Sequence, residues 1–154
     1  MPLILTLLHL ICVGITLNDP KKKNISQKML SLIFWIIPVV SWLVCAIMYG
    51  TAAGMKVNIG MVTNIIIGIL FMVVGNYIPK SKQSYTVGIK LPWTLASTEN
   101  WNKTSRLAGK LWIVGGILFI INAFLLYSGV LFIVILLMAV IPAVYSFCLY
   151  KKGI

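Results

Sequence analysis

Residues 111–150 read LWIVGGILFIINAFLLYSGVLFIVILLMAVIPAVYSFCLY and contain no charged side chain. A membrane-spanning helix needs about 20 consecutive apolar residues, so this stretch is long enough for two spans. The Tyr127-Ser128-Gly129 sequence near its middle predicts a tight turn. We therefore predict two antiparallel membrane helices, over residues 111–127 and 130–150, joined by a short hairpin.

Three further apolar segments precede this stretch, at residues 3–17, 30–49 and 57–74. The chain has 154 residues, of which 60% are hydrophobic and 10% charged, and its mean hydropathy is +1.03. A soluble domain carries about 25% charged residues, so this composition indicates a membrane protein. The apolar runs are continuous rather than alternating, which argues against a transmembrane barrel. We predict an all-α polytopic transmembrane bundle of about five spans, forming a single domain over residues 1–154.

The first segment is the weakest of these spans. It is about 15 residues long, so it crosses a bilayer only where the bilayer thins or the helix is extended. It lacks a basic n-region and an A-x-A cleavage signal, so we interpret it as a retained helix rather than a signal peptide.

The basic residues predict the orientation of the spans. The chain has thirteen Lys and Arg residues and two acids, giving a net charge of +11. Twelve of the basic residues fall in the loops at residues 18–29 and 75–110 and in the C-terminal tail, and only Lys56 falls in the loop at 50–56. The positive-inside rule places the C-terminus in the cytoplasm and the N-terminus on the opposite side of the membrane. Since loop placement explains the charge, we expect no direct binding of nucleic acid.

The loop at residues 75–110 is the only long polar interruption of the apolar sequence. Asn76 and Pro79 predict the end of the third span, because the residue before a proline is biased away from α geometry. Apolar and polar residues alternate from Tyr85 to Ile89, which is consistent with a short strand-like piece.

The second half of this loop predicts a turn and then a helix. Gly88 is suited to a backbone conformation that other residues avoid, and Pro92-Trp93-Thr94 predicts a structured turn with Trp93 at the membrane interface. Ser97 is a good N-cap, and Glu99 in the following turn favours the helix dipole.

This loop helix carries two stripes at helical spacing, one aromatic and small and the other basic. They consist of Trp101, Ser105, Ala108 and Trp112, and of Lys103, Arg106 and Lys110. The pattern predicts an interfacial helix that continues into the fourth span. Its surface either docks a cytoplasmic partner, a peptide or an anionic headgroup, or anchors the helix at the lipid interface.

Three blocks of the loop resemble the signature of the SdpI-type bacterial immunity proteins, which are integral membrane toxin-immunity proteins. The blocks are GNYIPK at 75–80, GIKLPWTLAS at 88–97 and WNKTSRLAGK at 101–110. They fall in the family's order and spacing. The matching positions, which mark a signature or partner-binding loop, are Gly75, Asn76, Pro79, Lys80, Gly88, Ile89, Lys90, Pro92, Trp93, Thr94, Leu95, Ser97, Trp101, Lys103, Thr104, Arg106, Gly109 and Lys110.

The resemblance implies a protein that protects its producer cell from a secreted antimicrobial peptide toxin by binding it. It also implies a signalling role, in which the toxin-bound protein recruits a transcriptional repressor to the membrane. No enzymatic activity and no cofactor are expected, and the partners implied are the toxin peptide, the cytoplasmic repressor and, from the basic stripe, anionic membrane lipids. Longer members carry a further N-terminal helix that we expect this chain to lack.

Catalytic and metal-binding patterns have little support in the sequence. The two acids, Asp19 and Glu99, lie 80 residues apart, and Cys12, Cys45 and Cys148 lie in apolar segments without CxxC spacing. His9 has no second ligand at helical spacing, so we expect no metal site.

A histidine and two asparagines fall within the predicted spans, namely His9, Asn64 and Asn122. Such residues either bond a neighbouring helix or line a polar cavity that binds a ligand. Together with Pro38 and Pro142 they motivate an alternative function, a small transporter or channel-like subunit, for which one cavity lined by these residues is expected. A membrane enzyme is a third reading, and it requires Asp19 or Glu99 beside other polar groups in a cleft.

Overall fold

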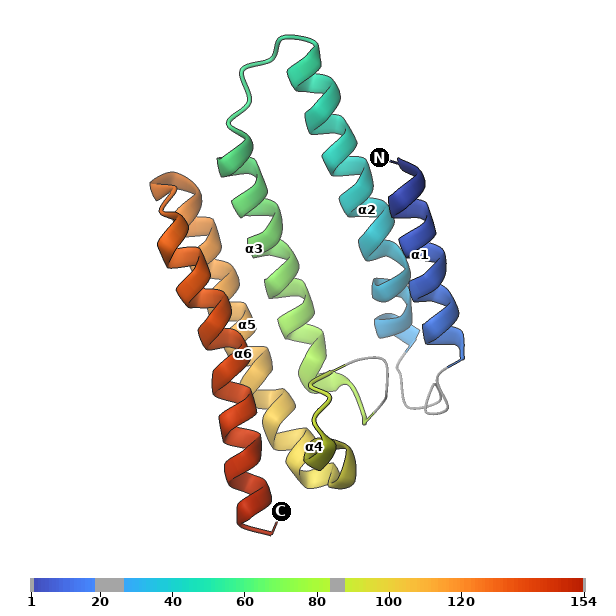
Figure 1. Ribbon diagram of the computed structural model, residues 1–154, viewed down its shortest axis with the longest axis vertical. Helices are drawn as coiled ribbons and strands as arrows, with labels where there is room; N and C mark the ends of the chain where they lie inside the picture. The colour runs from blue at the N-terminus through green and yellow to red at the C-terminus, as the bar shows by residue number, and fades with distance from the viewer. Residues whose placement is uncertain (1, 19–26, 84–87, 154) are drawn as a thin grey trace.

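The computed structural model describes residues 2–18, 27–83 and 88–153 of the chain (Figure 1). The described residues form helices and connecting turns, and none of them forms a strand. The elements are α1 (Pro2–Leu17), α2 (Gln27–Ala52), α3 (Ile59–Tyr77), the 3₁₀ turn η2 (Ile78–Lys80), α4 (Pro92–Ala96), α5 (Thr98–Leu125) and α6 (Ser128–Lys151). The predicted all-α fold is confirmed, and each of the five predicted spans is a helix.

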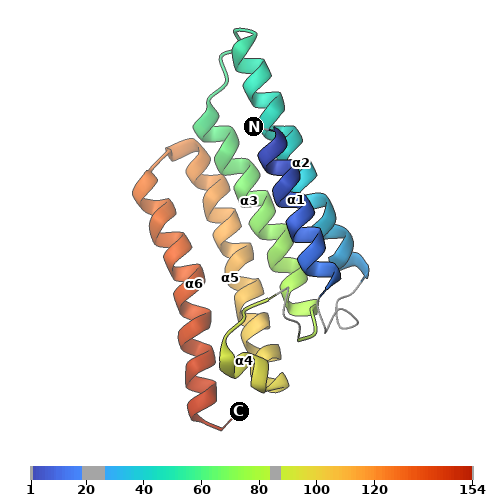
Figure 2. The same cartoon turned by 45° about the vertical axis from the view of Figure 1, so that its right-hand side comes forward.

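The five long helices run up and down in two groups. α1 and α2 lie side by side on one flank, and α3, α5 and α6 form the other group, in which α5 contacts both neighbours (Figures 1 and 2). Within the described residues, four helices are long and apolar enough to cross a membrane, namely α2, α3, α5 and α6. α1 is apolar but has only 16 residues, in line with its prediction as the weakest span.

The α3–α5 crossing is built on paired glycines. A Cβ on Gly68 would lie 2.7 Å from the carbonyl oxygen of Gly116, and a Cβ on Gly116 would lie 2.5 Å from that of Gly68. Gly75 and Gly109 repeat this reciprocal contact seven residues along each helix, at 2.9 and 2.6 Å. The two backbones therefore touch without intervening side chains, as small residues allow in membrane helices.

Apolar side chains fill the remaining space between these helices. Phe119, Val134 and Met138 form the buried cluster between α5 and α6. Phe71 of α3 packs edge-on against Trp112 and Phe119, with ring centroids 5.4 and 5.2 Å apart. Such T-shaped pairs add specific geometry to the burial of apolar area.

The ends of α3 and α5 follow their local sequence, with one difference. α3 ends at Tyr77 as predicted, but Ile78 keeps right-handed helical angles (φ −51°, ψ −47°) because it opens the turn η2. The prediction that this residue leaves helical geometry was therefore wrong. α5 begins immediately after Ser97, whose Oγ accepts from the backbone N–H of Asn100 at 3.3 Å.

α5 is one helix of 28 residues, with no break where the loop meets the fourth span. The predicted interfacial helix is therefore the first part of α5, and its depth relative to the lipid interface stays a prediction. α5 ends with Leu126 in the left-handed conformation (φ 54°), and α6 starts two residues later. The two helices form the predicted antiparallel hairpin, but its turn lies at residues 126–127, one residue earlier than predicted, because Ser128 and Gly129 already belong to α6.

With the exception of Lys56, the described basic residues lie at one end of the molecule. Lys56 lies in the connection between α2 and α3, whereas η2, α4, the start of α5 and the end of α6 lie at the opposite end (Figure 1). Lys21, Lys22 and Lys23 lie outside the described residues. The folded protein thus has more basic residues at one end than at the other, as the orientation argument assumes. The assignment of the basic end to the cytoplasm remains a prediction.

Candidate functional site

The signature loop folds into a compact unit at the basic end of the bundle, which we call the loop cap (residues 78–83 and 88–105). Trp101 is its centre and is 1% exposed. The indole Nε1 donates to the carbonyl oxygen of Ser81 at 3.1 Å. Gly88 lies flat against the same ring, because a Cβ there would come within 2.6 Å of Cζ2 and Cη2. Gly88 also has φ +110°, so the special backbone conformation predicted for it is confirmed.

Thr94 and Gln83 hold the middle of the loop cap. Pro92–Ala96 forms the short helix α4, so the predicted turn is helical. Thr94 is fully buried, and its Oγ1 accepts from the N–H of Leu91 at 2.9 Å and lies 2.8 Å from the carbonyl oxygen of Ile89. The side-chain amide of Gln83 donates to the carbonyl oxygens of Thr94 and Leu95, at 2.9 and 2.7 Å. It thereby caps carbonyls that the end of a short helix leaves without partners.

A buried polar cluster joins the loop cap to the last helix. Asn100 Nδ2 donates to the carbonyl oxygen of Ser146 on α6 at 3.1 Å. Its Oδ1 accepts from Ser146 Oγ at 2.8 Å and from Thr104 Oγ1 at 3.0 Å. All three side chains are at most 1% exposed. A buried cluster whose polar groups are hydrogen-bonded fixes one register between α5 and α6. If one helix shifted along the other, these buried polar groups would lose their hydrogen-bond partners.

Asn100 is a residue that the sequence reasoning missed. The signal was its spacing: it lies four residues before Thr104 and next to Trp101, on the face that the aromatic stripe marks as special. Its partner Ser146 is 46 residues away, in the last apolar segment, and was not distinguished from the rest of that span.

Trp93 extends the loop cap onto α6. Its ring packs against Phe147 with centroids 5.5 Å apart and stacks on Tyr150 at 6.0 Å. Its Nε1 is covered and has no acceptor among the described residues. The placement of Trp93 at a lipid interface stays a prediction, but its contact with the end of α6 is a feature of the fold.

The two stripes predicted on the loop helix separate as expected. Trp101, Ser105 and Ala108 are buried in the protein, and Trp112 is partly buried. Trp101 therefore faces protein rather than lipid. On the other face Arg106 and Lys110 are exposed, and Lys103 pairs with Glu99 at 2.7 Å.

The other signature residues divide between packing and surface. Gly75 and Gly109 form the helix contact described above, and a Cβ on Gly109 would also overlap Pro79. Lys80 donates to Asn76 Oδ1 at 3.1 Å and lies over the ring of Tyr77. Lys90 is exposed. The structure thus brings the apolar and hydroxyl residues of the signature together, and the lysines surround them. Tyr85 and Val87, and with them most of the predicted strand-like piece, lie outside the described residues.

Asn64 and Asn122 join α3 and α5 far from the loop cap. Asn122 Nδ2 donates to Asn64 Oδ1 at 3.5 Å, and Asn64 Nδ2 donates to the carbonyl oxygen of Gly60 at 2.8 Å. Asn122 Oδ1 accepts from the N–H of Tyr127 at 3.2 Å, which also caps the hairpin. These contacts favour the interpretation of both amides as links between helices.

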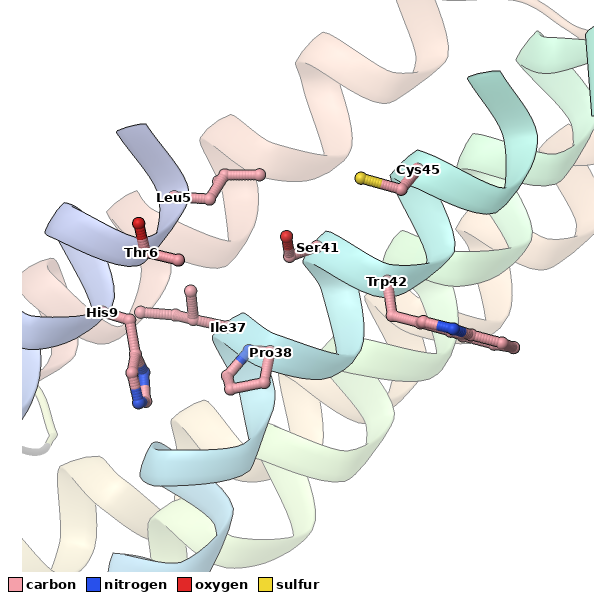
Figure 3. A pocket seen from close by; sticks show the side chains of 8 residues that line it. All are labelled: Leu5, Thr6, His9, Ile37, Pro38, Ser41, Trp42 and Cys45. Carbon is pink, nitrogen blue, oxygen red and sulfur yellow. The ribbon is translucent and has the colours of Figure 1, made fainter. Parts of the chain in front are cut away.

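His9 lies in a separate cavity between α1 and α2 (Figure 3). The cavity has a volume of about 360 Å³ and is lined by Leu5, Thr6, His9, Ile37, Pro38, Ser41, Trp42 and Cys45. His9 Nδ1 is covered and has no partner among the described residues. Asn64 and Asn122 bond one another elsewhere, and Pro142 is buried. The polar residues of the spans therefore do not share the single cavity expected of a transporter.

The part of the chain that is described contains neither a cluster of metal-ligating side chains nor a pair of carboxylates. Within it, no three His, Cys, Asp or Glu residues come together as metal ligands. Asp19 lies outside the described residues, and Glu99 is an exposed carboxylate held by Lys103.

Comparison with known proteins identifies the same region. Residues 80–146, from the end of η2 into α6, match the SdpI/YfhL protein family. The chain is 31% identical over 104 residues to the Immunity protein SdpI of Bacillus subtilis (strain 168), in an alignment covering 64% of this chain and 49% of that relative. The chain thus spans about half the length of the curated relative it matches. No solved structure matches it. The predicted resemblance to the SdpI-type immunity proteins is confirmed: residues 80–146 of this multi-pass membrane chain are similar to the SdpI/YfhL protein family.

Proposed function

We propose that this chain is an integral membrane immunity protein that protects its producer cell by binding a secreted peptide toxin. The observation that carries the proposal is the 31% identity to an immunity protein. The mechanism is binding rather than turnover, because the buried polar side chains of Thr94, Asn100 and Thr104 bond one another or the backbone and so serve the fold. The described carboxylate, Glu99, is exposed and paired with a lysine.

The arrangement of α5 supports a role in transmitting the bound state. α5 contacts α3 and α6 through the membrane part and contacts η2 and α4 in the loop cap. A peptide that changes the packing of α3, α5 and α6 therefore acts on an element that also builds the loop cap. The Asn100–Ser146 contacts tie α6 to the same unit. A two-state arrangement of these helices is the physical element that such coupling requires.

The loop cap is, in this proposal, the cytoplasmic face that a transcriptional repressor recognises. The basic end of the bundle lies in the cytoplasm and the N-terminus lies outside, following the charge asymmetry. Arg106 and Lys110 are exposed and lie on one face of α5, where an acidic surface or an anionic lipid surface can approach them.

The immunity role is tested in cells that a secreted peptide of the native strain kills. Cells expressing the full chain are expected to survive the culture supernatant of that strain, and cells with an empty vector are expected to die. Equal killing of both, with the protein present in the membrane fraction, contradicts the proposal.

The loop-cap role needs a separate readout. Trp101→Ala removes the centre of the loop cap and is expected to lower the protein level. Lys103→Ala with Arg106→Ala leaves the buried contacts intact and is expected to preserve survival but weaken recruitment of the repressor to membranes. Lys56→Ala, at the opposite end, is the matched control. If the double variant recruits the repressor normally, the loop cap serves only to connect α3 and α5.

A further inference from the structure

A second cavity lies where the loop cap meets the end of α6. It has a volume of about 230 Å³ and is lined by Trp93, Ala96, Ser97, Tyr150 and Gly153. α4 and the C-terminal end of α6 lie side by side at this end of the bundle (Figures 1 and 2). We propose that this cavity binds the phosphate group of an anionic phospholipid. The proposal rests on the membrane placement of α6 and does not depend on toxin binding.

The length of α6 places the cavity at the depth of lipid headgroups. α6 has 24 residues, which corresponds to about 36 Å at ~1.5 Å per residue. The hydrocarbon core of a bilayer is about 30 Å thick, so the two ends of the helix reach the headgroup regions. Tyr150 and Gly153 stand at such an end. Trp93 and Tyr150 are also the aromatic types that favour this depth.

The surroundings of the cavity are cationic. Lys151 and Lys152 are exposed and lie in sequence between the lining residues Tyr150 and Gly153, and Lys151 Nζ lies 5.2 Å from the centroid of the Phe147 ring, which packs against Trp93. Glu99 is the acid nearest in sequence among the described residues, and Lys103 Nζ holds it at 2.7 Å. Among the described residues, a phosphate in the cavity therefore meets lysine charge and no acidic side chain that lacks a basic partner.

The walls offer donors for phosphate oxygens. Ser97 Oγ accepts from the N–H of Asn100, which leaves its own hydrogen for a ligand. The Trp93 ring forms a wall, and its Nε1–H lacks an acceptor. A covered donor without a partner is unfavourable, so a phosphate oxygen that reaches this N–H would satisfy it. The site thus combines a headgroup-sized space, an unused donor and adjacent lysines.

Native mass spectrometry of the purified full chain in a neutral detergent tests the site. Dioleoyl phosphatidylglycerol and dioleoyl phosphatidylcholine are titrated separately, and the wild type is expected to bind the anionic lipid more tightly. Trp93→Phe keeps the ring contacts but removes the donor, and it is expected to weaken binding about tenfold. Lys151→Gln is expected to weaken it about fivefold. Ala96→Phe fills the cavity and is expected to abolish the preference.

Lys56→Gln is the control for a lost charge, because it lies at the opposite end, and its binding is expected to match the wild type. Thermal unfolding of each variant separates lost binding from lost folding. If correctly folded Trp93→Phe and Ala96→Phe bind phosphatidylglycerol like the wild type, the cavity is not the site. If glycerol phosphate competes at millimolar concentration, the ligand is a soluble phosphate, which overturns the lipid assignment. Because no toxin is present, a failed immunity assay leaves this result unchanged.

Discussion

Gly116→Ala tests whether the backbone contact between α3 and α5 holds the bundle together. The new Cβ would lie 2.5 Å from the Gly68 carbonyl oxygen and 2.7 Å from Met72 Cγ. Cβ contacts below 3.0 Å essentially never occur, so the helices must separate by at least 0.5 Å at this point. Since the nearest atom belongs to backbone, rotation of a side chain cannot relieve the overlap.

The expected cost follows from two opposing effects. Overpacking of a close contact costs about 1–3 kcal/mol. Replacing glycine by alanine inside a helix recovers up to about 1 kcal/mol. Because the overlap is with backbone, the overpacking cost falls in the upper part of its range, about 2–3 kcal/mol, and the variant is expected to lose about 1–2 kcal/mol of unfolding free energy relative to wild type.

The assay is unfolding in mixed micelles of increasing sodium dodecyl sulfate, followed by circular dichroism. Gly14→Ala is the matched control, because no atom lies within 4 Å of its new Cβ, and it is expected to be as stable as wild type or more so. The double variant Gly75→Ala, Gly116→Ala is expected to cost less than the sum of its parts, because the first substitution already separates the helices. A Gly116→Ala protein as stable as wild type would refute the backbone contact.

Three other substitutions test the remaining contacts. Asn122→Ala removes both the link to Asn64 and the cap on Tyr127 N–H, so it is expected to lose about 1–2 kcal/mol in the same assay. An unfolding free energy equal to that of the wild type would show that neither contact stabilises the bundle. Gly88→Ala, which meets both the Trp101 ring and a φ of +110°, is expected to speed trypsin cleavage of the loop several-fold at unchanged helix content. Unchanged cleavage would show that Gly88 does not lie against the indole. Lys103→Ala is expected to change the unfolding free energy by less than about 0.5 kcal/mol, because its ion pair with Glu99 is exposed. A larger loss would indicate a buried role for this lysine.

The spans were predictable because the length of an apolar segment must match the thickness of the bilayer, and because charged residues mark the loops outside it. The start of α5 was also predictable, since the cap at Ser97 is a local interaction. Ile78 was not, because the preference of residues before proline yielded to a 3₁₀ turn that continues the helix axis. Local sequence signals therefore predicted the positions of the helices. They failed at Ile78, where the chain changes from an α-helix to a 3₁₀ turn.

The interior of the loop cap was predictable in outline only. The stripe that contains Trp101 marked the correct face of α5. The partners of Trp101, at Ser81 and Gly88, come from chain segments that meet it only in the folded protein. The Asn100–Ser146 cluster joins positions 46 residues apart, and neither residue carries a local signal of the other. Side-chain pairing over such separations depends on how the helices cross.

The unbroken course of α5 has a mechanical consequence. Its 28 residues correspond to a rod of about 42 Å, which passes from the hairpin at one end to the loop cap at the other. If the hairpin end is held, a tilt of about 5° displaces the other end by about 4 Å, roughly the rise of two to three helical residues. A kinked or interrupted helix would absorb such a tilt at the break. In this protein the rod acts as a lever, so a movement that is small within the membrane becomes a movement of side-chain size at the surface.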